Sequence, residues 1–158
     1  MYHKNSKRII VAMLVVLTVV CSAVFMTACG KDDKLNNNSQ KSITIYIGET
    51  SVAATTTTGN MYDLFTEMKA NGKLSAFECD GSKYSAYLTK LNDLSPAKNQ
   101  YIAVYHDIND MGLQEFDNTT FLVKSVVHFD KTFYFSGVGI TLLPVVDGAN
   151  YWFTVLSF

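Results

Sequence analysis

Three side chains of this sequence have the chemistry that an enzyme or a metal site could use. Cys79 offers a thiol, and His106 and His128 are the only imidazoles after the first 28 residues. A nucleophile beside a base, or a metal centre, can be built from such groups. Their spacing is not that of zinc ligands, and no nucleophile-elbow motif surrounds them. We therefore expect no catalytic site, and we interpret Cys79 as a small buried residue at the end of a strand.

The segment from Asp107 to Gly112 begins like a calcium-binding loop. Asp107 and Asn109 stand at positions 1 and 3 of such a loop, and Gly112 stands at position 6. Met111 at position 5 and Asn118 at position 12 cannot supply the carboxylates that calcium needs there. Because Asn and Gly also favour ordinary loops, we expect a surface loop, with no metal and no cofactor.

The residues around Cys29 have the types and order of a lipid-attachment site. Two small residues precede this Cys in the segment Met26-Thr27-Ala28-Cys29, and Gly30 follows it. The segment resembles the lipobox of bacterial lipoproteins, in which a peptidase cleaves before the Cys and its thiol carries diacylglycerol. Met26 departs from the usual Leu. The resemblance implies a lipid on Cys29, and Cys21 is a poorer match because a β-branched residue precedes it.

Residues 1–28 have the organisation of a secretory signal peptide. The first eight residues carry three bases and no acid, and residues 9–20 are apolar except for Thr18. The apolar character continues to Ala28, which is also long enough for a retained membrane helix. The motif at Cys29 favours cleavage over retention. We predict a protein held by acyl chains on a bacterial cell membrane, facing the outside of the cytoplasm.

Cleavage before Cys29 would leave 130 residues that carry ten Lys, no Arg and fourteen acidic residues, a net charge of −4. Arg is the preferred ligand of phosphate groups and guanine edges. A mildly acidic protein without Arg is a poor candidate for nucleic-acid binding. With Cys29 lipidated, Cys79 is the only thiol left, so no intramolecular disulfide can form.

The remaining chain divides into a tether and one domain. Residues 29–41 are almost entirely polar and predict a solvated tether between the membrane and residues 42–158. The domain opens with a strand in which three isoleucines alternate with polar residues: Ile43, Ile45 and Ile47. Residues 51–58 are β-branched and predict its partner strand.

A single helix follows this hairpin. Its apolar residues recur at the spacing of one helix face: Met61, Leu64, Phe65 and Met68. Asn60 or Thr58 can cap its start, and the pair Asn71-Gly72 favours its end.

The pattern after the helix predicts six strands, over residues 74–79, 83–91, 100–106, 121–129, 132–135 and 149–158. In the last of them, Tyr151, Phe153 and Val155 share one face, whereas Trp152, Leu156 and Phe158 share the other. Because both faces are apolar, we expect this strand to be central in the sheet or covered on both sides.

A hairpin, then a helix, then further strands predict an α+β fold of the β-grasp type, with a mostly antiparallel or mixed sheet and the helix on one face. Six segments carry a closer resemblance: residues 41–48, 61–65, 84–88, 101–105, 137–140 and 147–153. With them the domain resembles bacterial domains of unknown function that are similar to the transcobalamin C-terminal domain. A Trp-rich strand of that family is replaced here by Tyr101-Ile102.

This resemblance implies an extracellular binding module. Transcobalamin-like proteins close the domain over a corrinoid beside a helical domain, but no position here maps to a corrinoid contact. Six tyrosines fall in predicted strands: Tyr84, Tyr87, Tyr101, Tyr105, Tyr134 and Tyr151. An exposed Tyr cluster would make a binding surface, although Tyr is also simply a good strand residue.

Two functions from different classes follow. The first is a lipid-anchored cell-surface module that binds a small molecule, a peptide or a glycan, with a corrinoid included by the resemblance. The second is a structural or protein-interaction lipoprotein that works through a free sheet edge or a flat apolar patch. Neither is an enzyme, and the sequence assigns no ligand-binding residue.

Overall fold

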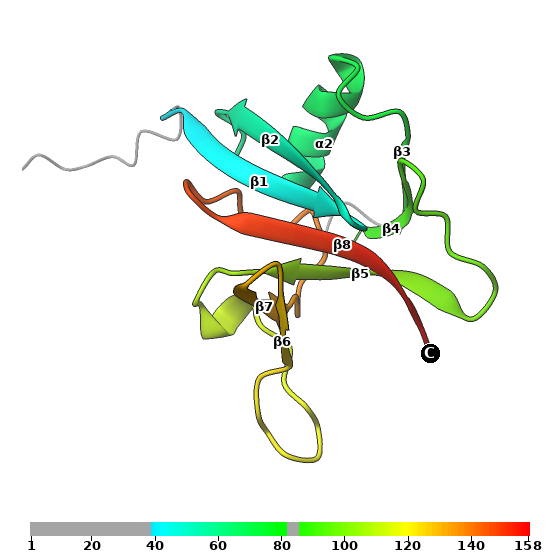
Figure 1. Cartoon of the computed structure of the whole chain (residues 1–158), viewed down its shortest axis with the longest axis vertical. Coiled ribbons are helices and arrows are strands. Elements are labelled where there is room, and N and C mark those ends of the chain that lie inside the picture. Colours follow the sequence, from blue (N-terminus) through cyan, green and yellow to red (C-terminus); the bar gives the residue numbers. More distant parts are fainter. Residues whose placement is uncertain (1–38, 82–85) are drawn as a thin grey trace, which may run out of the picture. The chain divides into compact units, whose positions relative to one another are not determined.

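The computed structural model describes residues 39–81 and 86–158. The elements in chain order are β1 (Lys41–Ile47), β2 (Thr50–Thr56), α2 (Met61–Ala70), β3 (Phe77–Asp80), β4 (Tyr87–Leu91), β5 (Gln100–His106), the short 3-10 helix η1 (Met111–Leu113), β6 (Ser125–His128), β7 (Lys131–Phe135) and β8 (Asn150–Ser157) (Figure 1). The predicted α+β class is confirmed. The predicted signal peptide, Cys29 and most of the tether lie outside the described residues. Among the helices of the described part, none is long and apolar enough to cross a membrane.

Six strands form one mixed sheet in the order β2-β1-β8-β5-β7-β6. β1 and β8 are parallel, with Ile45 opposite Tyr151, and every other neighbouring pair is antiparallel. β8 therefore lies inside the sheet, as its two apolar faces predicted. β3 and β4 form a separate two-stranded sheet.

The helix α2 forms where the apolar periodicity placed it. Asn60, not Thr58, is its N-cap, because the Asn60 side-chain oxygen accepts a hydrogen bond from the Asp63 backbone N–H at 2.9 Å. The helix ends at Ala70, and Gly72 then adopts a left-handed φ of +69°, which a glycine tolerates without steric cost.

The main core lies between α2 and one face of the sheet. All four residues of the predicted helix stripe are buried there: Met61, Leu64, Phe65 and Met68. They meet the inward side chains of the central strands, which include Ile43, Ile45, Ile47, Ile102, Tyr151 and Phe153. The Phe65 ring lies 5.1 Å from the ring of Phe153. Burial of this apolar surface is the dominant stabilising term of the fold.

The opposite face of the sheet carries an aromatic cluster: Tyr46, Tyr105, His128, Phe129, Phe133 and Trp152. The Trp152 ring stacks between Tyr105 at 4.9 Å and His128 at 4.3 Å. Tyr46 stacks on Phe129 at 4.3 Å. Because these rings cover one another, the cluster is a second small core. It fixes the β6–β7 hairpin, which crosses the direction of β5 and β8 steeply (Figure 1).

The turn of that hairpin is strained. Phe129 and Asp130 form its two-residue loop and have φ values of +50° and +57°. Positive φ at both central positions is the geometry of a type I′ turn, which Asn and Gly favour. A Phe occupies this turn because its ring reaches Tyr46.

Several strands differ from their predicted bounds. β5 spans the predicted residues 100–106, whereas β3 and β6 are shorter than predicted. Residues 121–124 lie outside β6. The Asp117 carboxylate accepts the backbone N–H groups of Thr119 and Thr120 and closes a turn just before them, and Val123 forms only an isolated bridge with Phe116. The short helix η1 was not predicted. It begins where the Asp110 carboxylate accepts the Gly112 N–H at 2.9 Å.

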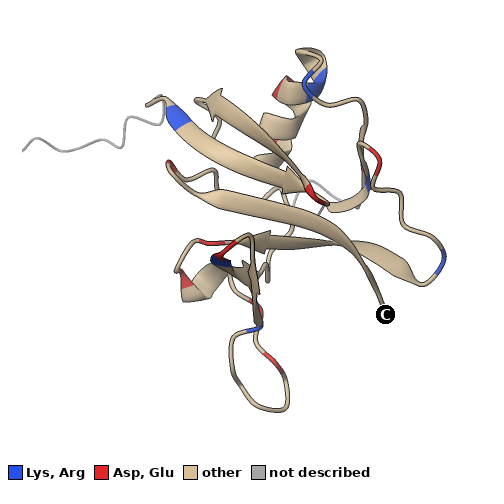
Figure 2. Cartoon of the chain, in the orientation of Figure 1, with Lys and Arg blue, Asp and Glu red and all other residues tan. Residues whose placement is uncertain are grey.

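Charged residues are found mainly on α2 and on the turns (Figure 2). β5 and β8 carry no charged residue. The two strands at the centre of the sheet are therefore uncharged.

Candidate binding site

A trough follows the edge of β5 that faces β4 and the connection after β7. It consists of two adjoining hollows with volumes of about 380 and 460 Å³. Both hollows are lined by Tyr87, Leu88 and Tyr101. They therefore form one continuous depression, which we call the β5 trough.

One edge of β5 lacks a strand partner along most of this trough, and in this sense we call it open. At the two ends of the β5–β8 ladder, the Asp107 N–H bonds to the Asn150 carbonyl and the Phe158 N–H bonds to the Asn99 carbonyl. Because hydrogen-bonded positions alternate along an antiparallel pair, the odd-numbered residues of β5 bond to β8. Even-numbered residues must then direct their N–H and C=O groups to the opposite edge. There β7 pairs only with Tyr105 and His106, and β4 makes no backbone hydrogen bond to β5 among the described residues.

The edge stays open because the chain turns away at the end of β7. The Ser136 N–H still bonds to the Val104 carbonyl at 2.9 Å. The next residue, Gly137, instead donates to the Leu113 carbonyl at 2.8 Å. The Ser136 hydroxyl then donates to the Val138 carbonyl at 2.8 Å and holds the turn. A Cβ atom at Gly137 would lie 2.8 Å from the Gln114 carbonyl oxygen, so this departure needs a glycine.

Two tyrosines flank the β5 trough. Tyr87 on β4 is 67% exposed, whereas Tyr101 on β5 is half-buried and lies against the rings of Phe135 and Phe158. Exposed Tyr at the rim of a depression is typical of binding surfaces, because it offers a large rigid contact area and a polar tip.

The charged residues that line the trough are acidic. Glu115 lines one hollow and Asp80 the other, and no Lys or Arg of the described residues lines either. Glu115 forms an exposed ion pair with Lys124, and this hydrogen bond raises the pKa of the Lys124 ammonium group. Lys124 thus compensates Glu115, and Asp80 is the lining carboxylate with no ion pair among the described residues, so the Asp80 end of the trough favours a neutral or basic group over an acidic one.

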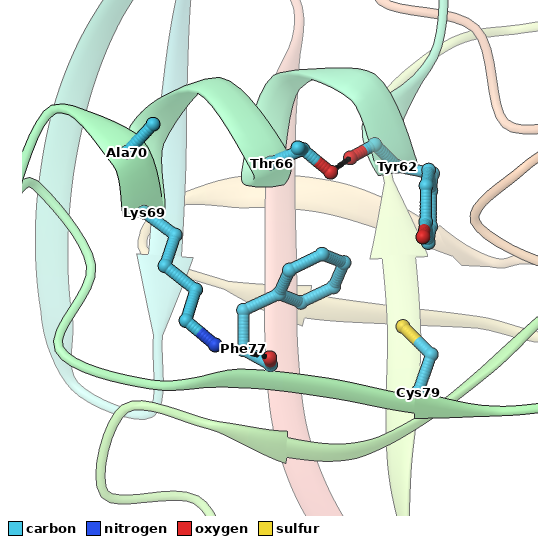
Figure 3. Close-up of a pocket in the computed structure, with 6 residues that line it drawn as sticks. All are labelled: Tyr62, Thr66, Lys69, Ala70, Phe77 and Cys79. Carbon is cyan, nitrogen blue, oxygen red and sulfur yellow. Dashed lines mark hydrogen bonds between the residues drawn. The ribbon is translucent and has the colours of Figure 1, made fainter.

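A second depression lies between α2 and β3, with a volume of about 460 Å³ (Figure 3). Its polar groups are already engaged in local bonds. The Thr66 hydroxyl donates to the Tyr62 carbonyl at 2.9 Å, and the Lys69 ammonium donates to the Phe77 carbonyl at 3.1 Å. This depression is not lined by β5, whereas the β5 trough follows a strand edge with backbone groups that have no backbone partner among the described residues.

Cys79 lies at the wall of this second depression (Figure 3). Burial raises the pKa of its thiol to about 11. A reactive cysteine needs a lowered pKa and free access, so the environment of Cys79 suppresses its nucleophilicity.

His106 is fully buried next to the loop that begins at Asp107. Its Nε2 lies 3.2 Å from the Leu113 carbonyl oxygen, which fits an imidazole that donates from this nitrogen. Burial lowers the pKa of His106 and outweighs the opposing effect of the nearby Leu113 and Ile108 carbonyls. His106 is therefore a neutral core residue.

His128 belongs to the aromatic cluster on the other face of the sheet. Its Nε2 lies 3.6 Å from a carboxylate oxygen of Glu49, a distance too long for a strong hydrogen bond. The fold thus places Cys79, His106 and His128 on β3, β5 and β6, with no hydrogen bond between any two of them in the described region.

The segment that begins like a calcium loop is occupied by structural bonds. The Asp107 carboxylate accepts the Asn150 backbone N–H at 2.8 Å and the Asn150 side-chain N–H at 2.6 Å. This pair of bonds joins the end of β5 to the start of β8. Asp110 caps η1. Within residues 39–81 and 86–158, no group of three or more His, Cys, Asp or Glu is placed to hold a metal ion.

The predicted tyrosines are divided between core and surface. Tyr151 is fully buried, and its hydroxyl donates to the Pro144 carbonyl at 2.7 Å. Tyr105 lies in the aromatic cluster, and Tyr84 lies outside the described residues. Only Tyr87 and Tyr101 meet at the trough. The open edge at Ile102 and Val104 was not predicted, because it depends on the residue at which β7 ends. The one sequence signal for that end is the pair Ser136-Gly137 after a run of β-forming residues.

No profile of a known protein family matches this sequence, and no curated protein sequence matches it. Among solved structures, the chain is similar to a proposed metal-binding protein from Ruminococcus gnavus ATCC 29149, with a TM-score of 0.44 and 10% sequence identity. The match covers 76% of this chain and 98% of the other. At this level of likeness, the neighbour defines neither the ligand nor the site.

Proposed function

We propose that this protein is a lipid-anchored binding module of the bacterial cell surface, and that its ligand lies in the β5 trough. The observation that carries the proposal is the trough itself. It combines an exposed aromatic rim, an apolar floor and backbone groups of β5 that have no backbone partner among the described residues. Concave sites with a few convergent polar groups are the usual places for ligands.

The sequence supports the lipid anchor. The basic start, the apolar stretch and the Met26-Thr27-Ala28-Cys29 segment agree with one another. We expect Cys29→Ala to abolish labelling by a fatty-acid probe in the native host and to leave an uncleaved precursor. Cys21→Ala is the matched control and should be labelled like the wild type. Equal labelling of both variants would contradict the anchor.

The topology supports a β-grasp assignment. A hairpin is followed by a helix that crosses one face, and the last strand returns parallel to the first in the order β2-β1-β8-β5. This arrangement leaves β5 next to the central pair, with the trough at its far edge. Under this proposal the β6–β7 hairpin and the β3–β4 pair are additions to a β-grasp core.

A non-catalytic role is also part of the proposal. The thiol of Cys79 has a raised pKa and His106 is buried and neutral, so neither is prepared for catalysis. A predicted mature chain with no Arg and a net charge of −4 further supports ligands other than nucleic acid.

The test uses residues 37–158, which form one compact unit. This domain is expressed in its own host and purified from the medium. Native mass spectrometry then measures whether its mass includes a retained ligand. Tyr87→Ala should lose the retained ligand. Tyr62→Ala, which alters the rim of the second depression (Figure 3), should keep it. Cyanocobalamin added to the empty domain tests the corrinoid expectation directly. A ligand that survives Tyr87→Ala but is lost in Tyr62→Ala would place the site under α2.

One observation favours the alternative function, a protein-interaction lipoprotein. Apolar side chains are exposed on the edge strand β6 and on the turn before it, with Val127 at 73%, Leu122 at 68% and Phe121 at 79% exposure. An unprotected edge of this kind pairs readily with another chain. Val127→Lys would weaken such an association and leave binding in the β5 trough unchanged.

A further inference from the structure

We infer that the ligand of the β5 trough is an extended peptide, which adds a strand to the open edge of β5. This inference rests on the proposed function, because it names the class of ligand for the same site. Strand addition is a recognised mode of peptide binding, in which backbone hydrogen bonds supply affinity and side-chain pockets supply specificity.

The backbone of β5 offers the hydrogen bonds that such a strand needs. Ile102 directs its N–H and C=O toward the trough, since its odd-numbered neighbours bond to β8. The Val104 N–H points the same way, and only its carbonyl is used, by Ser136. Had β7 continued, Val138 would lie opposite Ile102. The turn at Ser136 removes Val138 from that place and leaves it for another chain.

The trough has the length of a short peptide. It follows β5 from Gln100 to Val104, and strand residues are spaced by about 3.4 Å. About four or five peptide residues therefore fit beside it. Every second side chain of the peptide would face the hollow that Tyr87, Leu88 and Tyr101 share.

The charge of the trough selects among peptides. Asp80 and Glu115 line it, without a described basic residue in the lining. Glu115 is already paired with Lys124, so a peptide with Lys or Arg near the end that lies at Asp80 complements the remaining carboxylate, whereas an acidic residue there meets like charge.

A glycan is a weaker match to the same groups. Sugar hydroxyls need several free polar side chains around an aromatic face, but four polar side chains of the trough are already engaged in local bonds: Asp80, Gln100, Glu115 and Ser136. Its regular feature is instead an amide donor and a carbonyl acceptor repeated at strand spacing, which a peptide backbone complements and a sugar does not.

The first measurement needs no ligand. In the free domain, residues 37–158, amide hydrogen exchange should be fast at Ile102 and Val104 and slow at Tyr101 and Ala103, whose N–H groups bond to β8. Equal protection of all four amides would show that the edge is covered, and would overturn the inference.

The second measurement identifies the binding mode. Hexapeptides displayed on phage are selected against the domain, and the selected peptide is resynthesised with a single N-methyl group at each position in turn. N-methylation removes one donor, so affinity should fall at least tenfold at every second residue and little at the residues between. Tyr87→Ala should weaken binding, Tyr62→Ala should not, and replacement of the peptide's basic residues by Glu should weaken it further.

The outcomes separate the two proposals. Loss of affinity without a two-residue period overturns strand addition but leaves a binding module in place. Failure to select any peptide, together with a small molecule retained in native mass spectrometry, overturns the peptide ligand and leaves the proposed function standing. Failure of both experiments overturns both.

Discussion

The two faces of the six-stranded sheet are covered in different ways. One face packs on α2 through aliphatic and aromatic side chains that are almost entirely buried. The other is covered by the β6–β7 hairpin through stacked rings that are mostly half-buried. On the first face, stabilisation is shared among many contacts within a closed core. On the second, it depends on a few ring pairs at one end of the sheet.

This contrast assigns different roles to the two faces. The helix face includes residues from β1, β5, β8 and α2, so its loss would unfold the whole domain. The hairpin face holds a peripheral unit, which can loosen while the central strands remain paired. Substitutions on each face should therefore differ in size and in how far their effects spread.

The largest effect should come from the helix face. Phe65 is completely buried, with its ring between those of Phe77 and Phe153. Phe65→Ala should cost about 3–5 kcal/mol of unfolding free energy, because it empties a core aromatic site. Urea denaturation of the domain measures this loss. A midpoint close to that of the wild type would mean that α2 is not the main cover of the sheet.

A smaller effect is expected on the hairpin face. Trp152→Ala removes the stacks on Tyr105 and His128 and the indole N–H bond to the Gly48 carbonyl at 3.2 Å. We expect a loss of about 2 kcal/mol, since Trp152 is only partly buried. Hydrogen exchange should accelerate mainly in β6 and β7. Uniform acceleration across the domain would contradict the peripheral role of this hairpin.

These two faces also differ in how well the sequence predicted them. The stripe from Met61 to Met68 indicates a helix and its buried side from local spacing alone. The paired apolar faces of the strand predicted over residues 149–158 correctly indicated an internal strand. The stack of Tyr46 on Phe129 joins residues 83 positions apart, and no local pattern in either segment indicates it. Local periodicity reports burial, but it does not report the partner.

The hairpin turn sharpens the comparison with a pair of substitutions. Asp130→Gly should stabilise the domain by about 0.5 kcal/mol, because a glycine adopts φ near +57° without strain and the ring stack is kept. Phe129→Asn also suits a positive φ but loses the stack on Tyr46, so it should cost about 1 kcal/mol. Both changes are read from urea midpoints at constant slope. If both substitutions stabilised the domain, the stack of Phe129 on Tyr46 would contribute little to its stability.

The helix face should also respond to pH through His106. Its pKa is lowered by burial, so the folded domain holds the neutral ring while the unfolded chain takes up a proton near its ordinary pKa of 6.5. The unfolded state then binds more protons, and stability should fall as the pH drops below about 6.5. Asp107 and Asp110 oppose this shift but do not reverse it.

Melting temperatures between pH 7.5 and 5 measure the effect. The variant His128→Asn, on the other face, is the control and should show the same decline as the wild type. A flat pH profile in that variant would assign the titration to the aromatic cluster instead.

The smallest effect concerns access to the helix side. Cys79 has a thiol pKa of about 11, so little thiolate is present at neutral pH. A thiol reagent should label it slowly in the native domain and fast in denaturant. Rapid labelling of the native state would show that the depression between α2 and β3 opens more readily than its packing implies.

The candidate site was less predictable than the fold. Composition and strand pattern indicated Tyr87 and Tyr101 as candidate binding residues, but they did not indicate that the two side chains line the same hollows. The open amides of Ile102 and Val104 depend on which residues pair with which strand, and on the turn at Ser136 that ends β7. Backbone groups have the same chemistry in every residue, so their availability is a property of topology.

The parallel pairing of β1 with β8 has a mechanical consequence. The two strands run in the same direction, so the start of β1 and the end of β8 lie at opposite ends of the pair. Tension applied between an anchor upstream of β1 and a partner held on β5, the other neighbour of β8, would pull β1 and β8 along their length. Their hydrogen bonds, such as the Gly48 N–H to the Phe153 carbonyl at 2.8 Å, would then bear the load together in shear. Such a domain resists pulling far better than one that unzips bond by bond.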